Sequence, residues 1–431
     1  MSEIIEPLRT GRLGRIQGFL TAQRQLVLDY MTAVSGSAGR LIFSLVYFIA
    51  LANTLSIPEF GLFATASAAG VMLSRILAFG FVSALYRTAT IRPLLIGTFM
   101  GGFVVLGLLS LPVLAAASWL THFIFFSGEL SLSLFAIVVA AEALLWRPAE
   151  TVVIVNNGMG RFGRAAILVI IATMLRAIAA MALVFTPAAD LQTWCLLYLA
   201  ANAASLVIAL AGFLPRQRLR FRLTLYWRRL PDSLYVAGAE LLFYLQMEMD
   251  KLLVLALGGP TLAGIYAIIM RLVDLTAIPI RTFSMMLVQK LMRTPDALAR
   301  AGARIGIEAA ILVVSTVALL CLAVLLRFFP NALGNNVAQA APLIMLALFV
   351  PGLRNLIEYQ AELLFARGQT AIRAANLALL AGAKAVLLAW MLANITDVAS
   401  LVLWLNAAFA ALYVASMLLT YAAMRLPARK I

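Results

Sequence analysis

The stretch LSIPEFGLF, at residues 55–63, separates two long apolar runs near the N-terminus. Proline fixes its own φ angle and glycine adopts angles that other residues avoid, so the two together are typical of turns. We therefore expect Pro58 and Gly61 to form a turn between two helices. The nearest arginines on either side, Arg40 and Arg75, lie inside the flanking apolar runs, where a charge is unexpected.

A second stretch of this type, LGGPTLAGIY at residues 257–266, repeats the order leucine, proline, glycine, aliphatic residue and aromatic residue. Its Gly264 lies 203 positions after Gly61. Two more pairs of similar segments follow at nearly the same offset. GRFGRAA, which begins at Gly160, matches GQTAIRAA, and RAIAAMALV, which begins at Arg176, matches KAVLLAWML. Three pairs in one order predict that the chain consists of two repeats.

The composition identifies the solvent. Hydrophobic residues make up 64% of the 431 residues and charged residues 12%, whereas soluble domains have about 45–50% and about 25%. So much apolar surface fits a lipid bilayer better than water. A membrane-spanning helix needs about 20 mostly apolar residues. We therefore expect an all-α polytopic membrane protein with twelve transmembrane helices, at residues 31–54, 62–85, 93–118, 131–154, 165–187, 192–214, 233–256, 262–286, 304–326, 340–365, 374–395 and 399–424.

Lysine and arginine are distributed unevenly over the segments between these spans. The two termini and the even-numbered loops hold 23 of the 33 basic residues, with Arg304 at a span edge counted in its loop, and the odd-numbered loops hold one, Arg327. Because basic loops stay in the cytoplasm, we expect both termini there. The same distribution explains most of the net charge of +15 without a nucleic-acid partner.

Six spans in each repeat would give both repeats the same orientation in the membrane. We therefore expect two six-helix lobes with a central cavity between them at mid-depth. The predicted segments are a cytoplasmic amphipathic segment at 1–30, an N-terminal lobe at 31–214, a basic cytoplasmic linker at 215–231, a C-terminal lobe at 232–424 and a cytoplasmic tail at 425–431.

Nine basic residues fall inside predicted spans, where each costs about 2.5–3.5 kcal/mol at the bilayer centre. Five of them have no acidic residue within four positions: Arg40, Arg75, Arg176, Arg281 and Lys384. Either acids on other helices pair with them, or they line a cationic cavity for an anionic ligand. Guanidinium groups match phosphate geometry, so the sharper hypothesis is that these five line a cavity for a phosphate or pyrophosphate.

The other four basic residues in spans have an acidic residue three or four positions away on the same predicted helix. These pairs are Arg147 with Glu150, Lys251 with Glu248, Arg271 with Asp274, and Arg354 with Glu358. They would be ion pairs, or alternatively parts of a proton or cation relay. The residues that we assign to ion coupling or ion pairing are Glu240, Glu248, Asp250, Arg271, Asp274, Arg354, Glu358 and Glu362.

Residues for covalent chemistry are scarce. Cys195 and Cys321 are far apart, without metal-ligand spacing, and His122 is the one histidine. The chain has no Walker A motif and no Gly-rich dinucleotide fingerprint. We therefore predict no catalytic residue, no metal, no cofactor and no enzymatic activity.

Two segments resemble a known family. GRLIFSLVYFIALANTLSIPEFGLFATASAAG with the following AFGFVSALYR is similar to the first two spans of polysaccharide-export (O-antigen-type) flippases, and DKLLVLALGGPTLAGIYAIIMRL is similar to the start of their second half. These flippases belong to the multidrug/oligosaccharidyl-lipid/polysaccharide exporter superfamily. The resemblance covers essentially the whole chain.

The resemblance implies a two-lobe helical bundle with alternating access. It implies translocation of an undecaprenyl-pyrophosphate-linked oligosaccharide across the bacterial plasma membrane, for exopolysaccharide or O-antigen biosynthesis. The implied partners are this lipid-linked oligosaccharide, membrane lipids, a polysaccharide polymerase and other export proteins. The family's cationic cavity would correspond to the five basic residues without a nearby acid.

Two alternatives remain open. A cation-coupled multidrug exporter of the same fold usually carries an acid in its first or seventh span, and here the seventh carries Glu240, Glu248 and Asp250. A peptidoglycan-precursor flippase would handle a related lipid-linked substrate, but that branch typically has fourteen spans.

Overall fold

The computed structural model describes residues 39–187, 189–293 and 301–426, except for the side chains of 278–279, 281–293, 301 and 303. Every regular element in these ranges is helical, which confirms the predicted all-α class. The elements are a first helix Gly39–Thr54, α2 (Ile57–Leu73), η1 (Ser74–Gly80), α3 (Val82–Ile91), η2 (Pro93–Leu95), α4 (Ile96–Phe125), α5 (Leu132–Ala140), η3 (Ala141–Trp146), α6 (Arg147–Gly158), α7 (Phe162–Val184), α8 (Leu191–Ile208), η4 (Ala209–Phe213), α9 (Leu223–Arg293), α10 (Ala301–Phe328), η6 (Pro330–Leu333), α11 (Asn335–Ile344), η7 (Met345–Ala347), α12 (Val350–Ala366), α13 (Thr370–Asn394) and α14 (Val398–Ala423).

Nine of the described helices are long and apolar enough to cross a membrane, or ten if the pair Asn335–Ala347 and Val350–Ala366, bent by 66°, forms one span. The first helix is apolar but shorter. The seventh and eighth predicted spans lie together in α9, which is interrupted at Gly259, where φ is +79°. The arrangement of twelve spans in two repeats stays a prediction.

Helix α2 begins inside the stretch 55–63. The Glu59 carboxylate accepts the N–H of Ser56 at 3.0 Å, and the Ser56 hydroxyl accepts the N–H of Glu59 at 3.4 Å. This reciprocal capping box starts a helix, and proline fits its first turn because the missing N–H has no intrahelical partner there. The prediction that Pro58 and Gly61 form a turn is therefore wrong, since both lie within α2.

The two similar stretches contact each other where α2 packs on α9. A Cβ atom on Gly61 would overlap the backbone nitrogen of Gly264 and the carbonyl oxygen of Pro260. A Cβ atom on Gly264 would overlap the carbonyl oxygen of Ile57. Only residues without a side chain allow two helix backbones to approach this closely. This contact joins the first half of the chain to the second.

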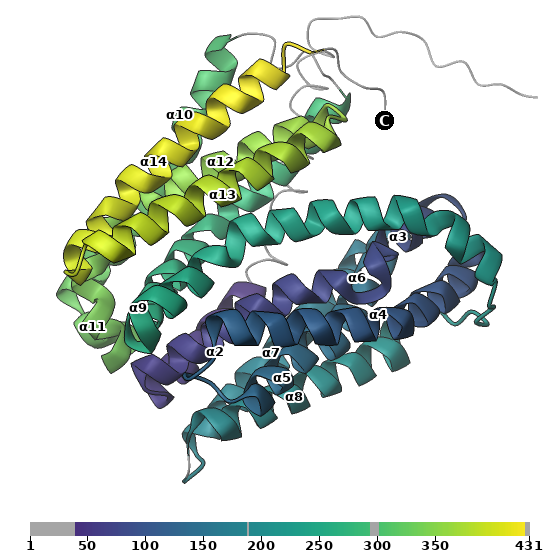
Figure 1. Ribbon diagram of the computed structural model, residues 1–431, viewed down its shortest axis with the longest axis horizontal. Helices are drawn as coiled ribbons and strands as arrows, with labels where there is room; N and C mark the ends of the chain where they lie inside the picture. Colours follow the sequence, from purple (N-terminus) through teal and green to yellow (C-terminus); the bar gives the residue numbers. More distant parts are fainter. Residues whose placement is uncertain (1–38, 188, 294–300, 427–431) are drawn as a thin grey trace, which may run out of the picture.

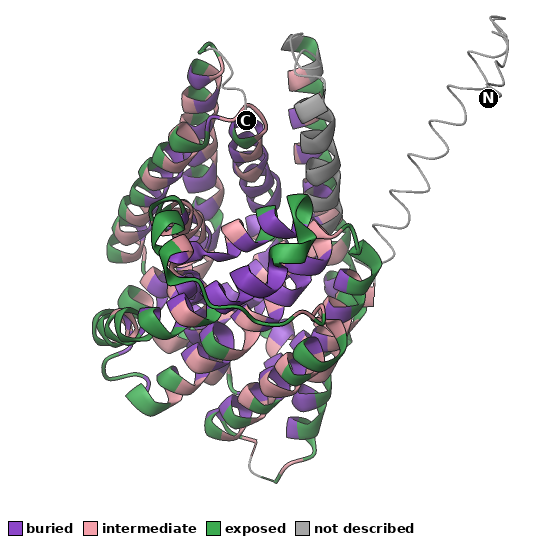
Figure 2. Cartoon of the chain, turned by 90° about the vertical axis from the view of Figure 1, so that its right-hand side faces the viewer, coloured by how far each residue is buried: buried purple, intermediate pink, exposed green. Residues whose placement is uncertain are grey.

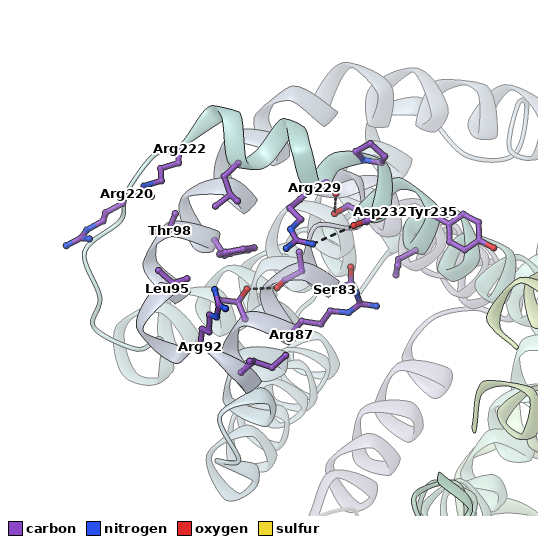
Figure 3. A pocket seen from close by; sticks show the side chains of 18 residues that line it. Ser83, Arg87, Arg92, Leu95, Thr98, Arg220, Arg222, Arg229, Asp232 and Tyr235 are labelled. Atoms are coloured by element: carbon purple, nitrogen blue, oxygen red, sulfur yellow. Dashed lines mark hydrogen bonds and ion pairs between the residues drawn. The ribbon is translucent and has the colours of Figure 1, made fainter. Parts of the chain in front are cut away.

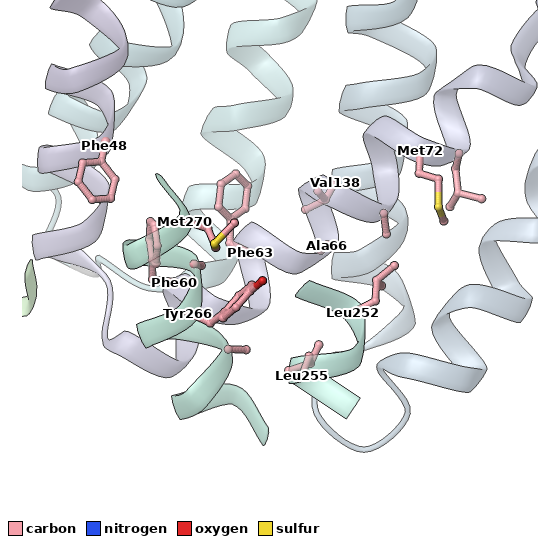
Figure 4. Packing of buried hydrophobic residues seen from close by; sticks show 14 of the residues in the cluster. Phe48, Phe60, Phe63, Ala66, Met72, Val138, Leu252, Leu255, Tyr266 and Met270 are labelled. Atoms are coloured by element: carbon pink, nitrogen blue, oxygen red, sulfur yellow. The ribbon is translucent and has the colours of Figure 1, made fainter. Parts of the chain in front are cut away.

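Buried apolar side chains surround the glycine contact. Phe60 and Phe63 of α2 pack with Tyr266 and Met270 of α9, and Phe48 of the first helix completes the group (Figure 4). All five side chains are more than nine-tenths buried. These side chains are therefore buried by other parts of the protein and do not need lipid to cover them.

The helices form two groups that diverge from this region. Helices α2, α4, α5, α7 and α8 lie in one group and α10, α12, α13 and α14 in the other, with α9 between them (Figure 1). The groups meet around α2, α9 and α11 and separate toward the end where α9 begins and the C-terminus lies (Figure 1). At the convergent end, Asn336 Nδ2 donates to the carbonyl oxygens of Ala52 and Leu55 at 2.7 and 2.8 Å.

The outer faces of both groups are apolar. Leu108, Ile178, Val386 and Leu418 are each more than half exposed, and exposed residues cover the outside of the helices in Figure 2. Apolar surface of this extent is expected where lipid, rather than water, covers a protein.

The helical path of the second predicted span is broken. Ala78, Phe79 and Gly80 have φ angles of 55°, 50° and 71°, in the left-handed region that non-glycine residues rarely adopt. The freed N–H of Ala78 donates to the hydroxyl of Ser110 at 2.9 Å, which satisfies a buried backbone group. The break lies three residues after Arg75.

Other paired segments adopt matching local conformations. Gly160, between α6 and α7, and Gly368, between α12 and α13, both have a φ of +71°. Asp190 and Asp397 cap α8 and α14 in the same way. Hydrogen bonds from Thr193 and Ser400 respectively lower the pKa of these two carboxyls. These similarities agree with the predicted repeats.

Substitution of Gly264 by alanine tests the helix contact. The added methyl group meets backbone rather than a flexible side chain, so we expect a loss of about 1–3 kcal/mol and a lower thermal midpoint in detergent. Gly382→Ala is the matched control, because a Cβ atom there has nothing within 4 Å. It should leave the midpoint unchanged or raise it, since alanine favours helix by ~1 kcal/mol. Equal midpoints for both variants would contradict the close contact.

Candidate functional site

Charged side chains inside the bundle gather in two clusters along α9. We call the first, made of Arg75, Arg147, Glu150, Glu240 and the ring of Tyr244, the N-side cluster. Glu150 Oε2 lies 3.1 Å from Arg75 Nη1 and 2.8 Å from Arg147 Nη1. Arg147 Nη2 lies 3.0 Å from Glu240 Oε2, and the Arg75 guanidinium lies 4.2 Å from the centre of the Tyr244 ring. Two guanidinium groups thus share two carboxylates.

The N-side cluster connects three elements. Arg75 comes from η1, Arg147 and Glu150 from α6, and Glu240 from α9. Arg147 is 1% exposed, and a buried charge is tolerated only when it is paired and hydrogen-bonded. The predicted Arg147–Glu150 pair is confirmed. Arg75, which has no acid near it on its own helix, pairs with an acid on another.

The second group, the C-side cluster, is centred on Asp250, which is fully buried. Lys384 Nζ lies 3.1 Å from Asp250 Oδ2 and donates to the carbonyl oxygen of Gln246 at 2.6 Å. The Tyr266 hydroxyl donates to the same carboxylate at 2.7 Å. Lys384 is therefore a second predicted cavity base that pairs with an acid across helices.

A central cavity of about 160 Å³ lies where the first helix and α2 meet α9. Its charged lining residues are Glu248, Lys251, Arg271 and Asp274. Lys251 Nζ lies 2.5 Å from Glu248 Oε2, which confirms that predicted pair. Four of the charged residues predicted from neighbouring positions on a helix thus line one small cavity, together with apolar side chains, at the junction of the two halves.

Two arginines at or beside this cavity have partners on other helices. Arg271 Nη2 donates to the hydroxyl of Ser44 on the first helix at 2.5 Å. Arg354 Nη1, from α12, lies 3.2 Å from Asp274 Oδ1. Arg354 was expected to pair along its own helix, but its carboxylate partner here comes from α9.

Arg176 has surroundings of a different kind. Its Nε and Nη2 donate to the amide oxygen of Asn202 at 3.1 and 2.6 Å. Its guanidinium lies 4.4 Å from the centre of the Trp146 ring and 5.4 Å from that of Tyr198. In the described part of the chain no carboxylate forms a salt bridge with it. Arg176 is thus held by a neutral amide and two aromatic faces.

Glu142 was missed by the sequence analysis. It is 2% exposed and accepts hydrogen bonds from Ser67 Oγ at 2.8 Å and from the Tyr198 hydroxyl at 2.5 Å. Tyr198 therefore connects Glu142 to Arg176. Glu142 lies in the π-helical turn η3, a geometry that often marks functional sites. Its signal in the sequence is an acid inside the apolar run FAIVVAAEALLW, with no base within four positions to draw attention to it.

A second missed acid is Glu308 of α10, which is also buried. Its carboxylate accepts hydrogen bonds from Tyr413 at 2.9 Å, from Tyr421 at 2.7 Å and from Gln360 at 3.2 Å. It lies in the C-terminal group of helices and is not part of either cluster on α9.

The remaining predicted residues lie elsewhere. Arg40 is an exposed residue at the start of the first helix, and the side chain of Arg281 lies outside the described residues. Glu362 pairs with Arg373 at 2.5 Å, and Glu358 is half-buried on α12. Three of the five predicted cavity bases are described in the interior: Arg75, Arg176 and Lys384. Each has a different environment, so the three do not form one site. Among described residues, no group of three His, Cys, Asp or Glu residues is arranged to hold a metal.

These features describe a polytopic helical bundle whose polar interior lies where its two groups of helices meet. The fold matches known transporters. It is similar to an inward-facing multidrug resistance MATE family transporter of the MOP superfamily, with a TM-score of 0.67, 14% identity, and coverage of 90% of this chain and 94% of that one.

Two further solved structures share the fold. An outward-facing MATE family transporter of the MOP superfamily gives a TM-score of 0.50 at 12% identity, covering 90% of this chain and 95% of that one. The other is a MOP superfamily transporter from Pyrococcus furiosus Vc1, in which reverse polarity of the binding pocket suggests a different function. It gives a TM-score of 0.58 at 16% identity, covering 92% of this chain and 94% of that one. No protein-family model and no curated protein matches the chain.

The buried Lys384–Asp250 pair is open to a double-mutant cycle. Lys384→Met leaves a carboxylate buried without its base, so we expect a loss of about 3–5 kcal/mol and a strongly lowered thermal midpoint in detergent. Asp250→Asn combined with Lys384→Met removes both charges and should recover much of that loss. Strictly additive effects of the two substitutions would show that the groups do not interact.

Proposed function

We propose that this chain is a flippase that moves an undecaprenyl-pyrophosphate-linked oligosaccharide across the bacterial plasma membrane by alternating access, for exopolysaccharide or O-antigen biosynthesis. Both termini would lie in the cytoplasm, within the two-lobe division 31–214 and 232–424 predicted above. The partners are the lipid-linked oligosaccharide, membrane lipids, and a polysaccharide polymerase with other export proteins.

The fold supports transport by alternating access. The same fold occurs in transporters solved in inward-facing and outward-facing conformations. In this chain the two groups of helices separate at the end where α9 begins (Figure 1), and the predicted basic linker 215–231, which runs into the first turns of α9, is the segment with the strongest cytoplasmic signal. With that linker in the cytoplasm, as we propose, the bundle would be open toward the cytoplasm.

The observation that carries the choice of substrate is that the acids of the two clusters on α9 and of the central cavity already have basic partners. Glu150, Asp250 and Asp274 each lie within 3.2 Å of an arginine or lysine from another element. An organic cation would have to displace these bases before it could pair with these acids. Arg176, held by Asn202 and aromatic rings, is instead placed to exchange a neutral partner for an anionic oxygen, and its planar group suits phosphate.

A cation-coupled multidrug exporter is the second candidate. Glu248 and Asp274 line the central cavity, and the fold is shared with multidrug transporters. If a proton or sodium ion replaced the basic side chain that pairs with each of these acids, ion binding would be coupled to export. A peptidoglycan-precursor flippase would use the same charges for a different lipid-linked pyrophosphate.

Substitution of Arg176 tests the flippase proposal in a strain whose chromosomal copy is deleted. Arg176→Gln keeps hydrogen-bonding groups but removes the charge, which is worth about 1.5–3 kcal/mol, so export should fall about tenfold or more. The measurements are surface polysaccharide and the lipid-linked oligosaccharide retained in the cytoplasmic leaflet. Arg327→Gln, at an exposed position near the end of α10, is the matched control and should export normally.

The outcomes separate the three candidates. Normal export from a well-inserted Arg176→Gln variant would remove Arg176 from the substrate site. Loss of resistance to toxic cations on deletion, with no retained lipid-linked oligosaccharide, would establish the exporter instead. Retention of a peptidoglycan precursor would establish the third candidate.

A further inference from the structure

A second cavity, larger than the central one, lies away from the interior clusters. It has a volume of about 890 Å³ and lies between α3, the start of α4 and the segment that leads into α9 (Figure 3). Five arginines line it: Arg87, Arg92, Arg220, Arg222 and Arg229. The first two come from the end of α3 and the others from a segment more than a hundred residues later, so the fold brings two basic segments together.

The later segment is fixed against α4 by specific contacts. The Gln217 side chain donates to the carbonyl oxygen of Pro93 at 2.8 Å and accepts the N–H of Gly97 at 2.9 Å. The buried hydroxyl of Tyr226 lies 2.8 Å from the carbonyl oxygens of Thr98 and Arg220. The chain that carries the arginines is therefore positioned before any ligand arrives.

Two glycines of α4 make room for this segment. A Cβ atom on Gly97 would overlap the carbonyl oxygen of Arg218, and one on Gly101 would lie 2.8 Å from that of Arg220. The extended chain thus lies directly on the helix backbone. Such close packing indicates a formed pocket wall rather than a loose loop.

The charge of this pocket is not balanced. Its one acidic lining residue, Asp232, lies 3.7 Å from Arg229, and both are largely exposed. Within the described residues, no side chain forms a salt bridge with Arg87, Arg92, Arg220 or Arg222. Clustered guanidinium groups repel one another, and phosphate oxygens are the anions that their geometry fits best.

Apolar side chains also line the pocket. Ile91, Leu95, Phe99 and Leu225 line it together with the arginines. Beside it, Trp227 is 58% exposed, and an aromatic residue at this position is typical of the membrane interface. A free phosphate ion would use only the arginines, whereas a phospholipid would use both surfaces.

We propose that this pocket binds the phosphate headgroup of an anionic phospholipid from the membrane leaflet on that side. The arginines bind the phosphate oxygens, and the apolar wall receives the first part of the acyl chains. A headgroup there would join α3 to the start of α9. Helix α9 also carries an acid of each interior cluster, Glu240 and Asp250. The proposal does not rest on the identity of the transported substrate.

Native mass spectrometry of the full-length protein in detergent, titrated with cardiolipin, tests the pocket. Arg220→Gln with Arg222→Gln should raise the cardiolipin Kd about 30-fold, at roughly one kcal/mol for each basic residue near the headgroup. Arg87→Gln with Arg92→Gln should have a similar effect, although these residues lie on another segment. The thermal midpoint provides a check that each variant is folded.

Arg216→Gln with Arg218→Gln is the matched control, because it removes the same charge from the same segment at residues that do not line the pocket. Its Kd should change about threefold or less in 0.15 M salt, where exposed charges are screened. An equal loss in the control would overturn the pocket in favour of general attraction to a basic surface. Stabilisation by inorganic phosphate as strong as that by cardiolipin would overturn a lipid ligand, and unchanged binding in both pocket variants would overturn the site.

Discussion

The approach of Gly61 to Gly264 is the contact on which the arrangement of the molecule depends. Neither residue has a Cβ atom, so α2 and α9 pack backbone to backbone. The two groups of helices are held closely at this end and diverge toward the other (Figure 1). Asp250 and Glu240 lie on α9 between these ends, roughly 14 and 29 Å from Gly259 along a helix that rises about 1.5 Å per residue. The interior charges are thus spread along the line where the halves separate.

A charge in such an interior must be neutralised wherever water is excluded. Here the neutralising partner is usually on another element: Arg75 reaches α6, Arg147 reaches α9, and Arg354 also reaches α9. Each of these pairs therefore favours the particular packing in which it is seen. A rocking motion of the two halves would have to replace the Arg147–Glu240 pair, which joins the first half to the second, with other partners, with water, or with a charged ligand. In the proposed transport cycle, this requirement would link the motion to the binding of an ion or anion.

Local features of this molecule could be predicted from sequence, and those set by tertiary packing could not. Composition was enough for the all-α membrane class, and three-residue spacing was enough for the pairs Arg147–Glu150 and Glu248–Lys251, because both are properties of one helix. The partner of Lys384 depends on how α13 packs against α9, which no spacing reveals. The capping box of α2 was visible in Ser56 and Glu59, but the proline and glycine beside it were given more weight.

The two classes of arginine in this chain differ in what surrounds them. In the N-side cluster, Arg75 and Arg147 contact carboxylates at close to 3 Å, which leaves little unbalanced charge. The arginines around the large pocket are exposed to solvent, and screening by the solvent weakens the repulsion between them. Transfer of that pocket to the edge of a membrane removes some of this screening and makes an anionic partner more favourable. Arginine side chains therefore stabilise the bundle where carboxylates pair with them, and favour the binding of an anionic ligand around the large pocket.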